Sequence, residues 1–396
     1  MVRTVGVAGS LHFLIHFAMM THPALVALAA VRGGDLFGIG EAGMWGYLLF
    51  GIFALVSGFL TDFWGSRFVL LLTGILVALG LWMVASLGSD GVHPESFRWA
   101  FALVGAGCGL YHPAGLALLG GIPLERRPSA MALHGVFGNA GIGSAPFIAY
   151  VGMEALGIVP FFVGIGTVSL GAGLVALTLP KCDVRAGRKR DHWKEFLTQT
   201  RPGYGIFFCW QGVVGIYYRM LITYLPAILG IGLSSLPKVA EGVGPLFSSV
   251  ALGLGILFQL LSGKWAKPGH LARQTALLFC GLALLGLVSG WVQGVGSLVW
   301  VALMGGVVFG HQPLTNSLLP RFVGEGHRGL GYGIQFFISF GMGSVGAWWG
   351  ARLLGKEFQG FQDWLWVLVG LATLSAVLMV LLSEKERSLP VKKPIR

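Results

Sequence analysis

Charged residues are scarce in this chain of 396 residues. Only 11% of the sequence is Asp, Glu, Lys or Arg, whereas 55% is hydrophobic, and the mean hydropathy is +0.77. Soluble proteins carry about 25% charged residues. Because a soluble core cannot hide so much apolar surface, the composition excludes an ordinary soluble domain. It predicts a protein that spans the membrane many times.

Cysteine is also scarce, and the motifs of common enzymes are missing. The four cysteines form neither a CxxC pair nor a metal-ligand spacing, so Cys108, Cys209 and Cys280 are interpreted as buried small hydrophobic residues. The chain contains no P-loop, no HExxH sequence and no nucleophile elbow. The glycines of "GAGCG" at 105–109 lack the strand–turn–helix setting of a dinucleotide site. We therefore expect no enzyme, no cofactor and no metal.

Long apolar runs dominate the sequence. A helix that crosses the bilayer needs about 20 mostly apolar residues, whereas a β-barrel shows alternating units of roughly ten residues. The runs here are continuous, so they predict an all-α membrane protein with twelve transmembrane helices. We place these helices near 5–30, 42–61, 68–88, 97–121, 130–152, 158–180, 203–229, 241–263, 271–291, 295–320, 329–354 and 363–383.

One long polar segment, residues 181–202, separates the first six predicted helices from the last six. We expect an N-terminal six-helix bundle over 1–180, a basic cytoplasmic linker over 181–202, and a C-terminal six-helix bundle with a cytoplasmic tail over 203–396. The basic residues of the linker are interpreted as a positive-inside signal and not as a nucleic-acid site. Part of the linker fits a short amphipathic helix on the membrane surface.

Basic residues also predict the orientation of the chain. With a cytoplasmic N-terminus, most of the positive charge falls on the inner side, and this asymmetry places both termini inside. The inner side then holds, besides the linker and the tail, Arg67, Arg126, Arg127, Lys264, Lys267, Arg273, Arg321 and Arg328. The outer loops hold Arg32, Arg98, Lys238, Arg352 and Lys356.

The two halves of the chain resemble each other at an offset of about 200 residues. Pro113 corresponds to Pro313, and "GIGS" at 141–144 corresponds to "GMGS" at 341–344. Repeats in the same orientation, related by an axis along the membrane normal, are typical of one large class of transporters. Duplication therefore predicts two pseudo-symmetric six-helix bundles.

The loop after the second predicted helix carries a spaced motif. The segment "GFLTDFWGSR" places Gly58, Asp62, Gly65 and Arg67 in the pattern G-x-x-x-D-x-x-G-x-R. This pattern resembles the signature of the major facilitator superfamily and is interpreted as a cytoplasmic gate. Glycines permit a tight turn, and Asp62 can cap the next helix or pair with a cation. The second half has Lys267 at the position of Asp62, so we expect an asymmetric gate.

Three glycine-rich segments narrow the resemblance. "GLYHPAG" in the fourth helix, "FGNAGIGSAPFIA" in the fifth and "FFISFGMGSVGAWWGARL" in the eleventh are similar to the fosmidomycin-resistance branch of the superfamily. This resemblance covers most of the chain and implies a drug exporter that exchanges its substrate for protons. We accordingly expect a monomer in the inner membrane of a bacterium. His16 departs from the branch, since the family has aspartate there, and this argues against carboxylate-based coupling.

Polar side chains gather in the first, fourth, seventh and tenth predicted helices, and the fifth and eighth add a few. Ionisable residues within membrane spans usually face the bundle interior or a water-filled cavity. The resemblance implies that the first, fourth, seventh and tenth helices line the central cavity. The candidate substrate-binding and cavity residues are His16, His112, Asn139, Gln211, Tyr218, Arg219, Gln259, His311, Gln312 and Asn316.

His16 and His112 lie near the middle of their predicted helices and are the candidates for proton coupling, because histidine titrates near pH 6.5. The alternative is that a membrane histidine only forms a hydrogen bond to a neighbouring helix, and this applies equally to His12, His22 and His134. His12 and His16 are one helical turn apart, which is also a metal-ligand spacing, but the sequence places no third ligand.

Arg219 is the one basic residue close to the middle of a predicted span. An unpaired guanidinium in the membrane costs roughly 3 kcal/mol even on lenient insertion scales. Either Arg219 reaches an acid near the outer end of a helix, or it faces water and binds an anionic group such as a phosphonate. We favour the anion. The acids near the outer ends are Asp35, Glu41, Glu154 and Glu241.

Pro113 and Pro313 are expected to break or kink the fourth and tenth helices. Proline removes a backbone hydrogen bond, and the glycines around Pro113 already loosen the helix. The freed carbonyls would then face the cavity. A kink without functional consequence is the alternative interpretation.

These patterns together predict a secondary transporter that moves a small anionic or amphiphilic molecule by alternating access, with proton-coupled efflux (antiport) as the expected mode. One alternative is uptake or uniport of an organic or inorganic anion. Another is a membrane sensor or assembly partner that transports nothing. The expected partners are a small-molecule substrate, the lipid bilayer and protons, and we expect no nucleic acid.

Replacing both His16 and His112 by asparagine is expected to flatten the pH dependence of transport, because asparagine does not titrate in the range where histidine does. Transport by the purified protein in liposomes, measured over a range of external pH, checks this expectation. An unaltered pH profile would argue against a proton-carrying role.

Overall fold

The computed structural model is built from helices, and the part of the chain that it describes contains no strand. It describes residues 2–32, 34–87, 93–120, 122, 127–179, 198, 202–234, 242–292, 295–323, 328–355 and 360–388. The predicted linker, 181–202, lies outside the described residues apart from Thr198 and Pro202.

Twelve helical spans follow one another, and they begin and end close to the bounds that the apolar runs predict. The first bundle contains α1 (Val2–Arg32), α2 (Leu36–Trp64), α3 (Ser66–Ser86), α4 (Pro94–Gly120), α5 (Arg127–Leu156) and α6 (Ile158–Ala176). The second contains α8 (Tyr204–Ser234), α9 (Val243–Trp265), α10 (Leu271–Trp291), α11 (Val295–Val307), η1 (Val308–Gly310), α12 (His311–Phe322), α13 (Arg328–Leu354) and α14 (Phe361–Arg387). α11, η1 and α12 together form the tenth span, so the predicted all-α fold class is confirmed.

Helices suit this chain because lipid offers no hydrogen-bond partner, so each spanning segment must satisfy its backbone internally. Ten candidate spans in the described residues are long and apolar enough to cross a membrane, and α5 and α13 are not among them. These two helices hold corresponding positions in the two bundles. Because α5 packs against α9 and α13 packs against α2, part of their surface meets protein instead of lipid.

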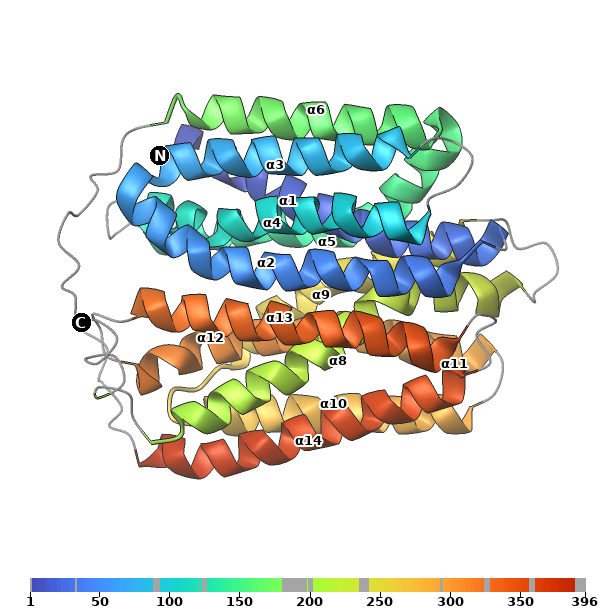
Figure 1. Cartoon of the computed structure of the whole chain (residues 1–396). Coiled ribbons are helices and arrows are strands. Elements are labelled where there is room, and N and C mark those ends of the chain that lie inside the picture. Colours follow the sequence, from blue (N-terminus) through green and yellow to red (C-terminus); the bar gives the residue numbers. More distant parts are fainter. Residues whose placement is uncertain are drawn as a thin grey trace.

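The two bundles lie side by side, with α1–α6 in the upper part of Figure 1 and α8–α14 in the lower part. We call the end where α1 begins and α14 ends the terminal end, and the opposite end the far end. The most extensive contacts between the bundles are those of α2 with α13, α5 with α9, and α1 with α8.

The far halves of α1 and α8 close the interface between the bundles. Every residue from 17 to 29 on α1 and from 219 to 229 on α8 is buried, whereas both helices have half-buried and exposed residues nearer the terminal end. The bundles are therefore packed more tightly at the far half of the molecule than at the terminal half.

Small residues let helices touch within a bundle, and the clearest case lies between α2 and α4. A Cβ atom added to Gly105 on α4 would lie 1.9 Å from the carbonyl oxygen of Gly46 on α2. A Cβ added to Gly109 would lie 2.3 Å from the carbonyl oxygen of Phe50. Membrane helices associate through such close backbone contacts, which accounts for the high glycine content of the chain.

The prediction for the cysteines is correct for Cys108 and wrong for two others. Cys108 is buried, but Cys209 and Cys280 are exposed on the surface of their helices. In a membrane protein the outer surface of a helix meets lipid, so an apolar residue type does not by itself indicate burial in the protein.

Replacing Gly105 by alanine is expected to destabilise the protein by about 1–3 kcal/mol, because the added methyl group must push the backbones of α2 and α4 apart. Gly171 is the matched control, since an added Cβ there meets no atom within 4 Å and alanine raises helix propensity. The midpoint of thermal unfolding in detergent should fall for Gly105→Ala only. Equal midpoints for the two variants would contradict the packing argument.

Candidate functional site

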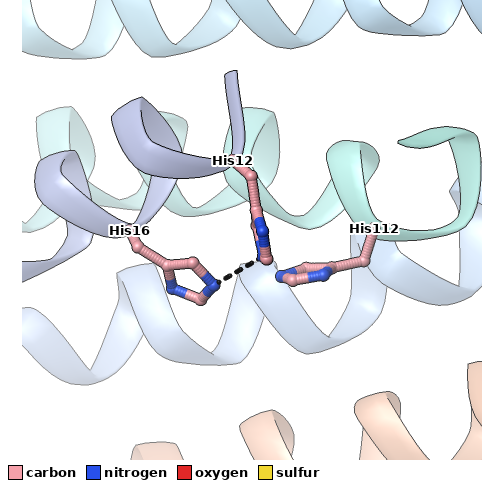
Figure 2. Close-up of side chains that lie close together, drawn as sticks. All are labelled: His12, His16 and His112. Atoms are coloured by element: carbon pink, nitrogen blue, oxygen red, sulfur yellow. Dashed lines mark hydrogen bonds between the residues drawn. The ribbon is translucent and has the colours of Figure 1, made fainter. Parts of the chain in front are cut away.

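Three histidines from α1 and α4 converge inside the first bundle, and Figure 2 shows their rings pointing toward one another. The Nε2 atoms of His12 and His16 are 3.1 Å apart. The ring of His112 lies 5.3 Å from each of the other two rings, centroid to centroid. One potential ligand atom from each histidine lies within 4.8 Å of those of the other two. We call His12, His16 and His112 the histidine cluster.

A second layer of polar groups holds the cluster in place. Nδ1 of His12 donates to the backbone carbonyl of His134 on α5 over 2.8 Å, and the two rings are stacked with centroids 4.0 Å apart. Nε2 of His134 lies 2.8 Å from the hydroxyl of Tyr111, which in turn donates to the carbonyl of Ala8. The predicted hydrogen-bonding role of His12 and His134 is therefore present in the structure.

His112 is the member of the cluster that reaches the second bundle. Its ring stacks on Phe336 of α13 with centroids 5.0 Å apart, and it also contacts Phe50 of α2. The side chain is 6% exposed, and its Nε2 atom has no hydrogen-bond partner among the described residues. A buried polar atom without a partner costs about 1–3 kcal/mol and calls for an explanation.

Arg219 lies at the interface of the two bundles and not in the histidine cluster. Its guanidinium carbon lies 3.7 Å from the centroid of the Tyr47 ring on α2, which is a cation–π contact. The Tyr47 hydroxyl is also 2.8 Å from Nδ1 of His22. Arg219 is only 5% exposed, so its charge is almost fully withdrawn from solvent.

Three of the four acids named for Arg219 bind other groups, and the fourth lies outside the described residues. Asp35 caps α2 by accepting from the N–H of Gly38 over 2.8 Å, and Glu154 pairs with Arg32 at 2.5 Å. Glu41 accepts from the indole N–H of Trp348 on α13 over 3.1 Å and pairs with Arg352 at 3.8 Å. Glu241 lies outside the described residues. Among the residues that the structure describes, no carboxylate pairs with Arg219.

A chain of three amides also joins the two bundles. Asn139 of α5 donates to Gln259 of α9, and Gln259 donates to Gln312 of α12 over 2.6 Å. Each of these side chains is half-buried. The sequence singled out all three residues, and only the tertiary structure shows that they bind one another.

Four other candidate residues lie within the second bundle. His311 donates from Nδ1 to the carbonyl of Val308 over 2.5 Å and packs against Trp210. Gln211 accepts from Ser339 over 2.7 Å, and its own NH₂ group is buried with no partner among the residues that the structure describes. Two candidates remain, of which Tyr218 packs on Phe309 and Asn316 is exposed.

A cavity of about 320 Å³ lies between the bundles toward the terminal end. α2 contributes Gly58 and Thr61, α4 contributes Pro113 and Ala117, and α13 contributes Phe336 among the lining residues. His112 is not among the lining residues, but it is adjacent to two of them, since Pro113 follows it in sequence and its ring stacks on Phe336. None of the ten candidate substrate-binding residues lines this cavity, Arg219 included.

The prolines act differently in the two halves. α4 continues as a helix from Pro94 to Gly120 with Pro113 inside it, so the break expected at Pro113 is not observed. α4 packs closely on α2 at Gly105 and Gly109, N-terminal to this proline. In the second half the 3₁₀ turn η1 interrupts the helix, and Pro313 lies in the first turn of α12, where a missing N–H costs little.

The motif after α2 forms a tight turn. Gly65, at φ +79°, separates α2 from α3. Arg67 donates to the carbonyls of Leu177 and Leu179, over 3.1 and 2.9 Å, where α6 has just ended. A cation stabilises the carbonyls at the end of a helix, so Arg67 joins α3 to α6 within one bundle. The side chain of Asp62 lies outside what the structure describes.

Comparison with known protein families decides the identity of the fold. The model of the Major Facilitator Superfamily matches residues 8–347. The chain belongs to the major facilitator superfamily. It is therefore a multi-pass membrane transporter with a small-molecule substrate.

Solved structures of major facilitator transporters share the fold at low sequence identity. A mutant of the nucleoside transporter NupG matches with 14% identity and a TM-score of 0.75, over 96% of this chain and 98% of that one. A D-xylose–proton symporter matches with 14% identity and a TM-score of 0.72, over 99% and 98%. A bacterial homologue of the human lysosomal transporter Spinster, inward-facing and unoccupied, matches with 12% identity and a TM-score of 0.70, over 96% and 97%. No curated protein matches the sequence. The narrower resemblance to the fosmidomycin-resistance branch stays a prediction.

The amide chain allows a direct test of contact between the bundles in this major facilitator protein. Asn139→Ala and Gln259→Ala are each expected to destabilise the protein by about 1 kcal/mol, because each leaves a half-buried amide without its partner. The double variant should lose less than the sum, with a coupling energy of about 0.5 kcal/mol or more. Thermal unfolding of the four proteins measures this term.

As a matched control, a second double variant combines Asn139→Ala with Asn316→Ala. The side chain of Asn316 is exposed and does not bind Asn139. These two changes should be additive. Additive effects for Asn139 and Gln259 as well would show that the amide chain does not join the bundles.

Proposed function

We propose that this major facilitator protein is a transporter, and not an enzyme, that moves a small anionic or amphiphilic molecule by alternating access. Arg219 is the group that binds the anionic part of the substrate. The observation that supports this proposal is a guanidinium 5% exposed, at the interface of the two bundles, with no carboxylate partner in the described part of the chain.

The contacts of Arg219 do not fully offset the free-energy cost of burying its charge. A cation–π contact with Tyr47 contributes about 0.5–2 kcal/mol, which is less than the roughly 3 kcal/mol that an arginine at mid-span costs on lenient scales. A bidentate anion would offset the difference, since guanidinium matches carboxylate and phosphate geometry. Arg219 and Tyr47 belong to different bundles, so an anion bound there interacts with the contact that must change when the bundles rearrange.

The shape of the interface supports alternating access. The far halves of α1 and α8 are fully buried, whereas the cavity of about 320 Å³ lies toward the terminal end. Because the charge distribution of the loops predicts cytoplasmic termini, this state opens toward the cytoplasm. Leu55, Phe59 and Leu116 are among the lining residues of the cavity, which suits the passage of an amphiphilic molecule toward the anion site at Arg219, outside this cavity.

Proton-coupled efflux remains a prediction, with His16 and His112 as the candidate carriers. Uptake is the second candidate, because one solved structure with the same fold is named as a D-xylose–proton symporter. The location in the bacterial inner membrane, the monomeric state and the role of the motif around Gly58, Asp62, Gly65 and Arg67 as a cytoplasmic gate are part of the same proposal. The proposal also includes the domain boundaries: an N-terminal bundle over 1–180, a linker over 181–202 and a C-terminal bundle over 203–396.

Arg219→Gln is expected to weaken anion binding by about 10- to 100-fold, the loss that follows when charged hydrogen bonds worth about 1.5–3 kcal/mol are removed. Arg219→Lys should weaken anion binding by a smaller factor, because lysine keeps the positive charge but lacks the bidentate guanidinium group. A thermal-shift screen against anions and drugs first identifies a ligand that stabilises the protein. Titration calorimetry and liposome flux then compare the variants.

Arg352→Gln is the matched control, because this arginine also lies in the second bundle but its side chain is 55% exposed at the far end. It should bind the ligand as the unmodified protein does. Unchanged affinity in Arg219→Gln, or a screen in which only neutral solutes bind, would show that Arg219 does not bind an anionic substrate.

A further inference from the structure

The histidine cluster has the composition of a metal site, although its sequence shows only two of the three ligands. His12 and His16 are one turn apart on α1, and the fold brings His112 of α4 against them. All three potential ligand atoms lie within 4.8 Å of one another. Imidazole nitrogen is the ligand that Zn²⁺, Ni²⁺, Co²⁺ and Cu²⁺ share.

The spacing of the nitrogen atoms is close to what such an ion requires. A tetrahedral zinc ion binds imidazole at about 2.0–2.1 Å, which puts two ligand nitrogens about 3.3 Å apart. The Nε2 atoms of His12 and His16 are 3.1 Å apart. All three potential ligand atoms lie within 4.8 Å of one another, so the nitrogens must move closer together for all three to bind one ion.

The hydrogen bonds around the cluster leave the right atoms free. His12 donates its Nδ1–H to the His134 carbonyl, so its Nε2 atom carries a lone pair that points at His16. Such a carbonyl contact to the outer nitrogen is typical of metal-binding histidines. In the neutral state Nε2–H of His16 donates to this lone pair. When an ion replaces that hydrogen, the proton of His16 moves to Nδ1 and the imidazole stays neutral.

His112 provides the independent observation. Its Nε2 atom is buried, has no partner among the described residues, and belongs to a ring that points toward the other two in Figure 2. A structural histidine would use this nitrogen in a hydrogen bond. A metal ion would supply the missing partner.

We propose that His12, His16 and His112 bind one divalent transition-metal ion of the class that prefers imidazole, with Zn²⁺ as the reference. Three neutral imidazoles leave the ion with its full charge and an open fourth position. The cluster contains no carboxylate, so the fourth ligand must be an anion or water from the space between the bundles. The ion and a proton compete for the same nitrogen atoms, so metal binding should weaken as the pH falls.

This site is distinct from Arg219. All three ligands come from the first bundle, on α1 and α4, whereas Arg219 lies on α8 and contacts Tyr47. The groups that face the cluster from neighbouring helices are His134 of α5 and Tyr111 of α4, and Arg219 is within electrostatic range of His16. Failure of the metal site would therefore leave the anion proposal standing, and the reverse is also true.

The experiment titrates the purified full-length protein in detergent with CoCl₂, whose visible absorption reports tetrahedral coordination, and then displaces cobalt with ZnCl₂. Equilibrium dialysis with elemental analysis gives the number of ions bound per chain. The expected result is one ion per chain, with affinity reduced at least about tenfold in both His16→Gln and His112→Phe. Phenylalanine suits position 112 because the ring there already packs among Phe50, Phe336 and Phe340.

Two control variants accompany these. His311→Phe removes a buried histidine of the second bundle, and Arg352→Gln removes an arginine that is 55% exposed at the far end. Both should bind Co²⁺ as the unmodified protein does. Size-exclusion profiles and unfolding midpoints show whether each variant is folded. If His112→Phe does not fold, His16→Gln still tests the site through a different ligand.

Three outcomes would overturn the proposal. One is no stoichiometric Co²⁺ binding by the unmodified protein. Another is binding that His16→Gln and His112→Phe leave unchanged, which would place the ion elsewhere on the surface. The third is equal loss in His311→Phe, which would show a general effect of removing a histidine.

Discussion

A polar side chain inside a membrane bundle must find its partner within the protein or in a water-filled space, because lipid offers none. This constraint explains the arrangement of most buried polar groups described above. His12 donates to the His134 carbonyl, Glu41 accepts from Trp348, and three amides bind one another in a chain. Several buried polar atoms have no partner among the described residues, and Nε2 of His112 is the one that belongs to a cluster of potential ligand atoms. The guanidinium of Arg219 has no carboxylate partner in the same part of the chain. These two groups are the ones at which we expect a ligand.

The contacts between the bundles follow the same constraint and connect it to transport. Arg219 of α8 meets Tyr47 of α2, His112 of α4 meets Phe336 of α13, and Gln259 of α9 joins α5 to α12. None of these contacts survives a large rotation of one bundle against the other. In the alternating access that we propose, each of them would help to set the relative stability of the two access states, and a ligand that alters one of them would shift the equilibrium.

The helices were predictable because burial in lipid demands long apolar runs, and such runs are visible in the sequence. Hydropathy does not predict the interior of the tenth span, because an apolar run does not reveal that η1 interrupts the helix before Pro313. At Pro113 the difference is reversed: the sequence favours a break or kink, but α4 continues through this residue. Cys209 and Cys280 were misjudged since hydrophobic residues in a membrane protein face lipid as readily as the core.

The sequence by itself determined the fold class, the number of spans and the residues that are expensive to place in a membrane, because hydropathy and residue type are local properties. It named His16, His112, Arg219 and the three amides for this reason. Only the tertiary structure decided which of them meet. His112 joins His12 and His16 because α4 packs beside α1. Within the described part of the chain no acid pairs with Arg219, since Glu41 and Glu154 bind other groups. Such pairings depend on how each helix is rotated about its axis and how far it is shifted along the membrane normal. Both are set by the simultaneous packing of many helices.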